Sequence, residues 1–161
     1  RQRQMCIRDR RTYLDETQKV SEAITLFEDF YKDFDRSRAI SMLEKLNIDS
    51  NARIKTLSKG TKEKVQLILV MSRRAKLYCL DEPIAGVDPA ARDYILSTII
   101  NNYEPDSTIL ISTHLISDVE NILDEVVFIK NGHIVLKNDV EDIRFNQGKS
   151  VDVLFREVFK C

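Results

Sequence analysis

Histidine and cysteine are scarce in this sequence of 161 residues, and their scarcity excludes several classes of protein. The two histidines and three cysteines show no paired spacing of the kind that binds zinc. An odd cysteine count also favours a reducing cytosol over a disulfide-bonded secreted fold. No apolar run approaches the ~20 residues that span a bilayer. The net charge of −1 argues against a strongly basic nucleic-acid binder, so no nucleic-acid partner is expected.

What the sequence does contain is typical of one globular domain with a real core. Hydrophobic residues make up 43% of the chain and charged residues 32%, a balance that argues against disorder. Only the first segment departs from this balance of hydrophobic and charged residues. Residues 1–11, RQRQMCIRDRR, are dense in charge and have no apolar period, so we interpret them as a disordered or non-native arm outside the fold.

Residues 12–75 have the periodicity of a helical subdomain. Helices are expected over residues 20–31, 36–46 and 59–74. Asp35 and Ser58 stand at the starts of the second and third of these helices, where a short polar side chain caps free amides. From Val65 onward the third helix is apolar nearly all round, which predicts that it is buried.

Residues 76–137 alternate between apolar strands and helices, and residues 138–161 follow as a helical tail. Strands are expected over residues 76–80, 107–112, 125–130 and 133–137, and helices over 89–103 and 115–123. Continuously apolar strands that alternate with helices indicate an α/β fold with a parallel sheet covered on both faces. Asn131-Gly132 predicts a tight hairpin between the last two strands, which adds an antiparallel element.

Two predicted strands end in groups that handle protons or metal ions. One ends in Asp81-Glu82 and the other in Ser112-Thr113-His114. Ligands of parallel α/β sheets bind at the carboxyl ends of the strands, so the two ends suggest one shared site. Phosphoryl transfer would use both acids, because one carboxylate can hold Mg²⁺ through water while the next orients the attacking water. The alternative is a solvated turn without function.

A second candidate site lies at the start of the third predicted helix, in LSKGT (57–61). Ser58 offers a hydroxyl, Gly60 leaves the backbone uncovered, and the first amides of a helix attract anions. The adjacent Lys59 adds positive charge. The alternative is an ordinary serine cap beside a chance glycine.

Together these motifs, in this order and spacing, resemble the ATP-binding subunit of an ABC transporter over residues 12–137. LSKGT resembles the family signature LSGGQ, KLYCLDE the Walker B strand, and AGVD the D-loop. The resemblance implies that Asp81 holds Mg²⁺, that Glu82 is the catalytic base, that His114 is the switch histidine and that Asp88 is the D-loop acid. It implies that Leu57, Ser58, Lys59, Gly60 and Thr61 contact the ATP of a partner subunit.

The sequence departs from the family pattern in two respects. Lys59 and Thr61 stand where the signature usually has glycine and glutamine. In addition, none of the four glycines begins a G-x-x-x-x-G-K-[ST] phosphate loop, and Gly148-Lys149-Ser150 is a decoy because Ile143 occupies the first glycine position. We therefore expect a partial P-loop NTPase (RecA-like) core in which 76–137 is the second half, and poor nucleotide binding by this chain alone.

The resemblance also implies partners and a location. It implies an ATPase that uses ATP and Mg²⁺, pairs head to tail with a second ATPase subunit, and powers transport through a transmembrane permease at the cytoplasmic face of the plasma membrane. Two alternatives stay open: a soluble ABC ATPase acting on ribosomes or DNA, and a non-catalytic interaction module. Glu82 argues against the module, since a glutamine there would favour it.

Overall fold

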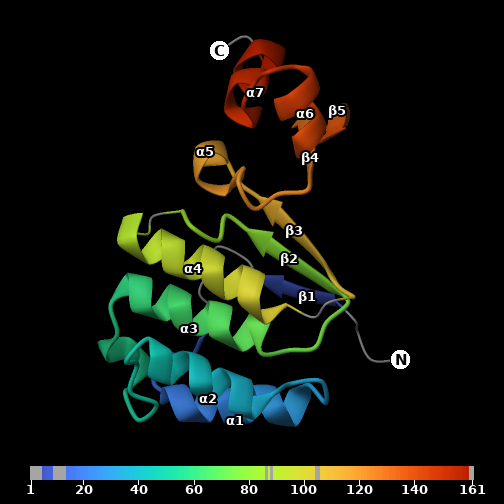
Figure 1. The fold of residues 1–161 in the computed structure, drawn as a ribbon. Coiled ribbons are helices and arrows are strands. Elements are labelled where there is room, and N and C mark those ends of the chain that lie inside the picture. Colours follow the sequence, from blue (N-terminus) through green and yellow to red (C-terminus); the bar gives the residue numbers. More distant parts are fainter. Residues whose placement is uncertain (1–4, 9–13, 86, 88, 104–105, 160–161) are drawn as a thin grey trace. The chain divides into compact units, whose positions relative to one another are not determined.

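The computed structural model describes residues 5–8, 14–85, 87, 89–103 and 106–159, and the chain forms two compact units, Arg1–Thr113 and His114–Cys161. The first unit contains β1 (Met5–Arg8), α1 (Val20–Phe30), α2 (Arg36–Lys45), the 3-10 helix η1 (Ile54–Thr56), α3 (Lys59–Met71), β2 (Leu77–Asp81), α4 (Pro89–Asn102) and β3 (Thr108–Ser112) (Figure 1). The second contains α5 (Ile116–Val119), β4 (Glu125–Lys130), β5 (His133–Asp139), α6 (Val140–Asn146) and α7 (Val151–Phe159). The predicted α/β class is confirmed.

A three-stranded parallel sheet organises the first unit, in the order β1-β2-β3. The register places Leu80 beside Ile111 and Asp81 beside Ser112. The parallel sheet predicted from the sequence is therefore present. The interpretation of residues 1–11 as an arm outside the fold differs from the structure at Met5–Arg8, which pairs with β2. A strand of four residues is too short to produce a periodic signal in the sequence.

Helix α3 provides much of the core of this unit, because every residue from Val65 to Met71 is buried. Burial on all sides was predicted for this segment and is confirmed. The helix ends at Met71, three residues before the predicted end at Arg74. Arg73 and Arg74 leave the helix because the segment between α1 and α2 binds them: the Arg74 amide donates to the Asp33 carbonyl at 2.9 Å, and the Arg73 guanidinium makes a bidentate ion pair with the Asp33 carboxylate.

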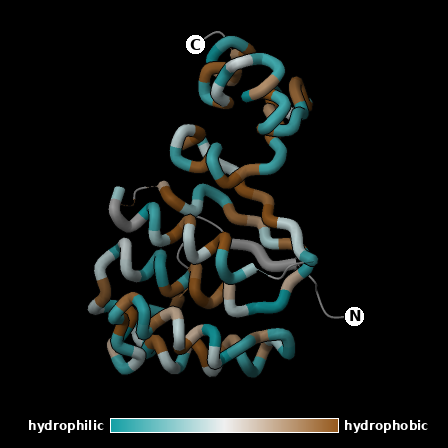
Figure 2. The backbone as a smooth tube through the Cα atoms, in the orientation of Figure 1, coloured by the Kyte–Doolittle hydropathy of each residue, from teal (hydrophilic) through white to brown (hydrophobic). Residues whose placement is uncertain are grey.

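The two faces of the parallel sheet differ in burial within the described residues of the unit. Tyr78 and Leu80 point to one face, and both are fully buried. Residues paired in register share a face, so Cys79 and Leu110 lie together on the other one. The exposed fraction of Leu110 is 58%, so the expectation that the sheet is covered on both faces is wrong for these residues. Hydrophobic residues nevertheless run along both strands (Figure 2). An apolar run in the sequence therefore does not tell which face of a strand is covered.

The second unit is a hairpin packed on two helices. Asn131 and Gly132 have φ angles of 51° and 78°, as a tight turn between β4 and β5 requires, so the predicted hairpin is confirmed. Val126 and Phe128 pack against a group of buried residues from α6 and α7: Val140, Ile143, Val151 and Leu154. The helix predicted over 115–123 is reduced to the four residues of α5.

None of the helices in the described part of the chain has both the length and the apolar character that a membrane span needs.

Candidate functional site

The carboxyl ends of β2 and β3 bring together the acidic pair and two hydroxyl side chains. Asp81 is the last residue of β2 and pairs in register with Ser112, the last residue of β3. The Ser112 hydroxyl donates a hydrogen bond to Oδ1 of Asp81. Both side chains lie on the less buried face of the sheet, so Asp81 keeps access to water and to a hydrated ion.

Glu82 has a different environment from its neighbour. Its backbone N–H continues the ladder by donating to the Ser112 carbonyl at 2.8 Å, and the chain then turns with a φ of +45° at Glu82. This left-handed conformation costs a non-glycine residue roughly 1–3 kcal/mol and persists where surrounding contacts determine it. The residue is 9% exposed, and its Oε2 accepts a hydrogen bond from Thr113 Oγ1 at 3.1 Å.

Two adjacent carboxylates would repel each other in one environment. Here the chain separates them, with Asp81 on the open face beside Ser112 and Glu82 buried beside Thr113. Each acid therefore has its own hydroxyl donor. The pair was predicted from the sequence, whereas the donor roles of Ser112 and Thr113 were not. Their place at the end of the neighbouring strand, where Ser112 pairs with Asp81, is the signal that points to them.

The residues after Glu82 form a turn that leads into α4. The Ala85 amide donates to the Glu82 carbonyl at 3.2 Å, and Arg92 Nε donates to the Val87 carbonyl at 3.1 Å. These bonds involve Ala85 and Val87, the described residues of the segment that the resemblance assigns to the D-loop. Asp88, its predicted acid, lies outside the described residues.

The signature segment forms the beginning of α3. Ser58 is the N-cap, and its Oγ accepts from the Thr61 amide at 3.2 Å and lies 2.8 Å from Thr61 Oγ1. The predicted serine cap is confirmed. Lys59 is exposed, Leu57 is half-buried, and a Cβ added at Gly60 would meet no atom within 4 Å among the described residues. The packing described for this unit therefore gives no reason for glycine at position 60.

His114 is the first residue of the second unit. That it reaches the same site as Asp81 and Glu82 stays a prediction.

The donors at the strand ends suit Mg²⁺. This ion prefers oxygen ligands and usually takes one or two carboxylates together with several waters. Asp81 is a partly exposed carboxylate with a hydroxyl beside it, which matches that preference. In the described ranges no group of three or more histidine, cysteine and acidic side chains gathers to form a protein cage for a metal.

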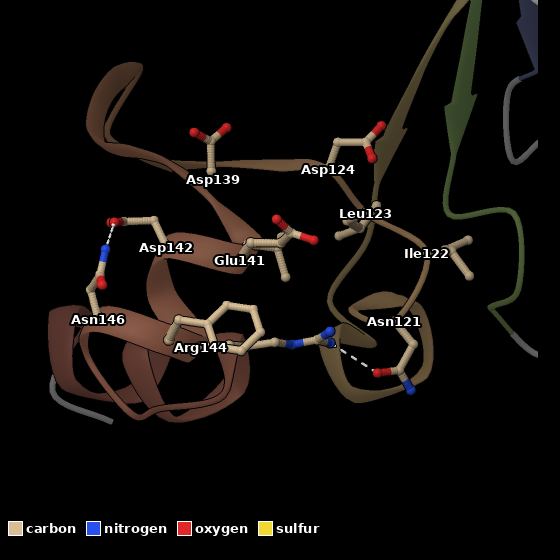
Figure 3. A pocket seen from close by; sticks show the side chains of 11 residues that line it. Asn121, Ile122, Leu123, Asp124, Asp139, Glu141, Asp142, Arg144 and Asn146 are labelled. Atoms are coloured by element: carbon tan, nitrogen blue, oxygen red, sulfur yellow. Dashed lines mark hydrogen bonds between the residues drawn. The ribbon is translucent and has the colours of Figure 1, made fainter.

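The second unit has an acidic pocket of about 730 Å³ between residues 121–124 and 139–146 (Figure 3). Carboxylates from Asp124, Asp139, Glu141 and Asp142 surround it, and Arg144 donates to Asn121 Oδ1 at 2.9 Å. None of the residues predicted to act on nucleotide lines this pocket, and it plays no part in the candidate site.

Comparison with known proteins finds a matching family model and several similar proteins. Residues 7–117 match the family model described as "AAA domain, putative AbiEii toxin, Type IV TA system". The chain is similar to the ABC-type transporter ATP-binding protein EcsA of Bacillus subtilis, with 26% identity over 92% of the chain and 66% of EcsA. It is also similar to an uncharacterized ABC transporter ATP-binding protein, MJ1023, of Methanocaldococcus jannaschii, with 35% identity over 63% of the chain and 39% of that protein.

A solved structure described as the ATP-binding subunit of an ABC transporter superposes with a TM-score of 0.79 at 26% identity, covering 97% of this chain and 68% of that one. The chain spans 42% of the length of another relative, the ABC transporter ATP-binding protein YtrB of Bacillus subtilis. The family resemblance predicted from the sequence is confirmed.

Proposed function

Because the chain belongs to the AAA-domain family and its relatives are ABC transporter ATP-binding proteins, we propose that it is part of an ATPase subunit that powers transport through a membrane permease. The observation that carries the proposal is the arrangement of Asp81 and Glu82 at the carboxyl ends of parallel strands, adjacent in sequence but divided between an open and a buried environment. A solvated turn without function would not need this division.

The two acids have separate roles in this proposal. Asp81 holds hydrated Mg²⁺, with its carboxylate oriented by the Ser112 hydroxyl. Bound Mg²⁺ would neutralise phosphate charge while the γ-phosphoryl group of ATP is transferred. Glu82 accepts a hydrogen bond from the attacking water and orients it. His114 and Asp88 complete the site in the manner that the family resemblance implies, as switch histidine and D-loop acid.

The start of α3 serves a second subunit. Ser58 and Lys59 are exposed, and the backbone at Gly60 is uncovered. Free amides at a helix N-terminus bind anions, and glycine permits a phosphate to approach the backbone closely. A head-to-tail pair would place the residues 57–61 of each subunit over the ATP of the other. The permease partner places the protein at the cytoplasmic face of the membrane. The names of the relatives favour transport over a soluble role on ribosomes or DNA.

The substitution Glu82→Gln in the full-length protein tests the catalytic role. It removes the water-orienting carboxylate and keeps the size of the side chain, so we expect hydrolysis of Mg-ATP to fall by roughly 10²–10⁴-fold. ATP affinity should change less than about twofold, because Glu82 orients water rather than binding the nucleotide. Phosphate release and equilibrium ATP binding are the two measurements.

Glu44→Gln is the matched control, since Glu44 lies exposed on α2. It should leave both quantities unchanged. Hydrolysis by the Glu82→Gln variant at the wild-type rate would contradict the role of Glu82. A wild-type protein that hydrolyses no ATP would contradict the proposed function itself.

A further inference from the structure

We propose that Thr113 is a positioning residue that holds the Glu82 carboxylate in its working orientation, an inference that rests on the proposed function. The contact that carries it is the hydrogen bond of 3.1 Å from Thr113 Oγ1 to Glu82 Oε2. It joins the ends of two neighbouring parallel strands across 31 residues of sequence. Thr113 would touch neither the nucleotide nor the water, and would act through Glu82.

The backbone delivers Glu82 to this position but does not orient its carboxylate. Hydrogen bonds from the Glu82 amide to Ser112 and from the Ala85 amide to Glu82 determine the left-handed turn. The glutamate side chain beyond it has three rotatable torsions, which cost up to about 2 kcal/mol in lost freedom when they are fixed. A contact at the carboxylate itself is therefore needed to select one orientation.

Threonine is well suited to make that contact. Its β-branched side chain has a restricted χ1, so its hydroxyl is held in a defined direction from the strand end. Glu82 is a buried residue, and a hydrogen bond is stronger in a buried environment than in water. An ionised carboxylate has about four acceptor positions, so a bond from Thr113 does not by itself prevent a bond to a water.

Consecutive residues of the second strand end thus serve consecutive acids of the first. Ser112 donates to the acid proposed to hold the metal, and Thr113 donates to the acid proposed to orient water. Misplacement of a catalytic group by about 1 Å can cost 10²-fold in rate. Loss of the Thr113 hydroxyl should therefore reduce turnover without reducing affinity for ATP.

Three substitutions test the inference. Thr113→Val removes the hydroxyl and keeps the shape and the β-branch, and Thr113→Ser keeps the hydroxyl. Thr108→Val makes the same change at an exposed position of β3, the strand that ends just before Thr113. In the nucleotide-free chain, NMR relaxation of the Glu82 side-chain methylenes should show the order parameter falling into the flexible range, below about 0.6, only in Thr113→Val.

Steady-state kinetics of the full-length protein provide the second readout. We expect kcat of Thr113→Val to fall by about 10–100-fold, with KM for ATP within about twofold of the wild type. Thr113→Ser should restore kcat to within about threefold, and Thr108→Val should change neither constant. Rescue by serine shows that the hydroxyl is responsible, and a fall in kcat without a change in KM is the result that a merely structural role would not give.

The outcomes separate the inference from the function on which it rests. Wild-type order at Glu82 in Thr113→Val overturns the inference, and so does an unchanged kcat in a protein that hydrolyses ATP. A wild-type protein without ATPase activity defeats the proposed function, and the relaxation data then decide the positioning of Glu82 alone. If Thr113→Val does not fold, the wild-type hydroxyl proton decides: slow exchange with a nuclear Overhauser contact to Glu82 supports the bond, and rapid exchange overturns it.

Discussion

Ser58 combines two roles that one pair of substitutions can separate. In the structure it caps α3, with its Oγ accepting from the Thr61 amide at 3.2 Å. In the proposed function its hydroxyl also faces the phosphates of a partner subunit's ATP. Ser58→Asp keeps a good cap and adds a negative charge, whereas Ser58→Ala removes the cap and adds no charge. The two variants should therefore rank in opposite order for stability and for turnover.

The expected sizes follow from the two roles. Aspartate caps helices about as well as serine, and its charge is favourable at a helix N-terminus, so the free energy of unfolding of Ser58→Asp should stay within about 0.5 kcal/mol of the wild type. Ser58→Ala should lose about 1 kcal/mol. For activity, two like charges ~4 Å apart at an effective dielectric constant of ~20 repel by about 4 kcal/mol. Turnover of Ser58→Asp should therefore fall by about 10³-fold, far more than the loss of one neutral hydroxyl contact.

Urea unfolding of the chain followed by circular dichroism measures the first quantity, and phosphate release by the full-length protein measures the second. Ser37→Asp is the matched control, because Ser37 is exposed in the first turn of α2, where an added charge also meets a helix N-terminus. It should leave turnover unchanged. If Ser58→Asp hydrolyses ATP as the wild type does, no phosphate approaches α3. If it is destabilised as much as Ser58→Ala, the cap has been misinterpreted.

Two further predictions concern the junction of α1, α2 and α3, and both are checked by urea unfolding. Arg73 pairs with Asp33 at 2.9 Å, with side chains 6% and 17% exposed, and its guanidinium lies 3.9 Å from the centre of the Tyr31 ring. Arg73→Ala should therefore cost about 3 kcal/mol by stranding a largely buried charge, whereas Arg74→Ala, at a side chain 64% exposed, should cost less than about 1 kcal/mol; equal losses would contradict this ranking. Hydrogen bonds from the Arg38 amide and the Arg74 guanidinium hold the pKa of Asp35 below its ordinary value, so its stabilising effect is present above the unfolded pKa of about 4 and is lost as the pH falls through the lowered folded pKa. The destabilisation by Asp35→Ala, about 1 kcal/mol at neutral pH, should shrink in strong acid, and a constant difference would show that the charge of Asp35 contributes nothing.

Local rules predicted the parts of the fold that local chemistry determines. Ser58 and Asp35 were predicted as caps, and both accept the expected amide hydrogen bond. Asn131-Gly132 was predicted as a tight turn, and both residues have positive φ angles. The end of α3 was misplaced because its cause is distant: Asp33 binds Arg73 from 40 residues away, and no helix propensity records that contact.

The pairing of strands is also invisible to local rules. Met5–Arg8 forms a strand because it pairs with the edge of β2. The sequence of these four residues alone contains no signal that predicts this pairing. The same holds for the exposed Leu110. An apolar run specifies a strand, but only the packing of other segments decides which of its faces is covered.

The candidate site shows the limit most clearly. The sequence shows that Asp81 and Glu82 are adjacent, and it predicts that a neighbouring group relieves the repulsion between their carboxylates. A cation was the expected answer for one of the acids. The structure adds a second answer, since the alternation of the strand and the left-handed turn at Glu82 place the two carboxylates beside different hydroxyls. Positive φ at a glutamate follows from no propensity scale and persists only because the surrounding hydrogen bonds require it. The turn at Glu82 is costly for a glutamate, and it lies where the neighbouring strand supplies both hydroxyl donors. A catalytic site explains such a turn more easily than a gain in stability does.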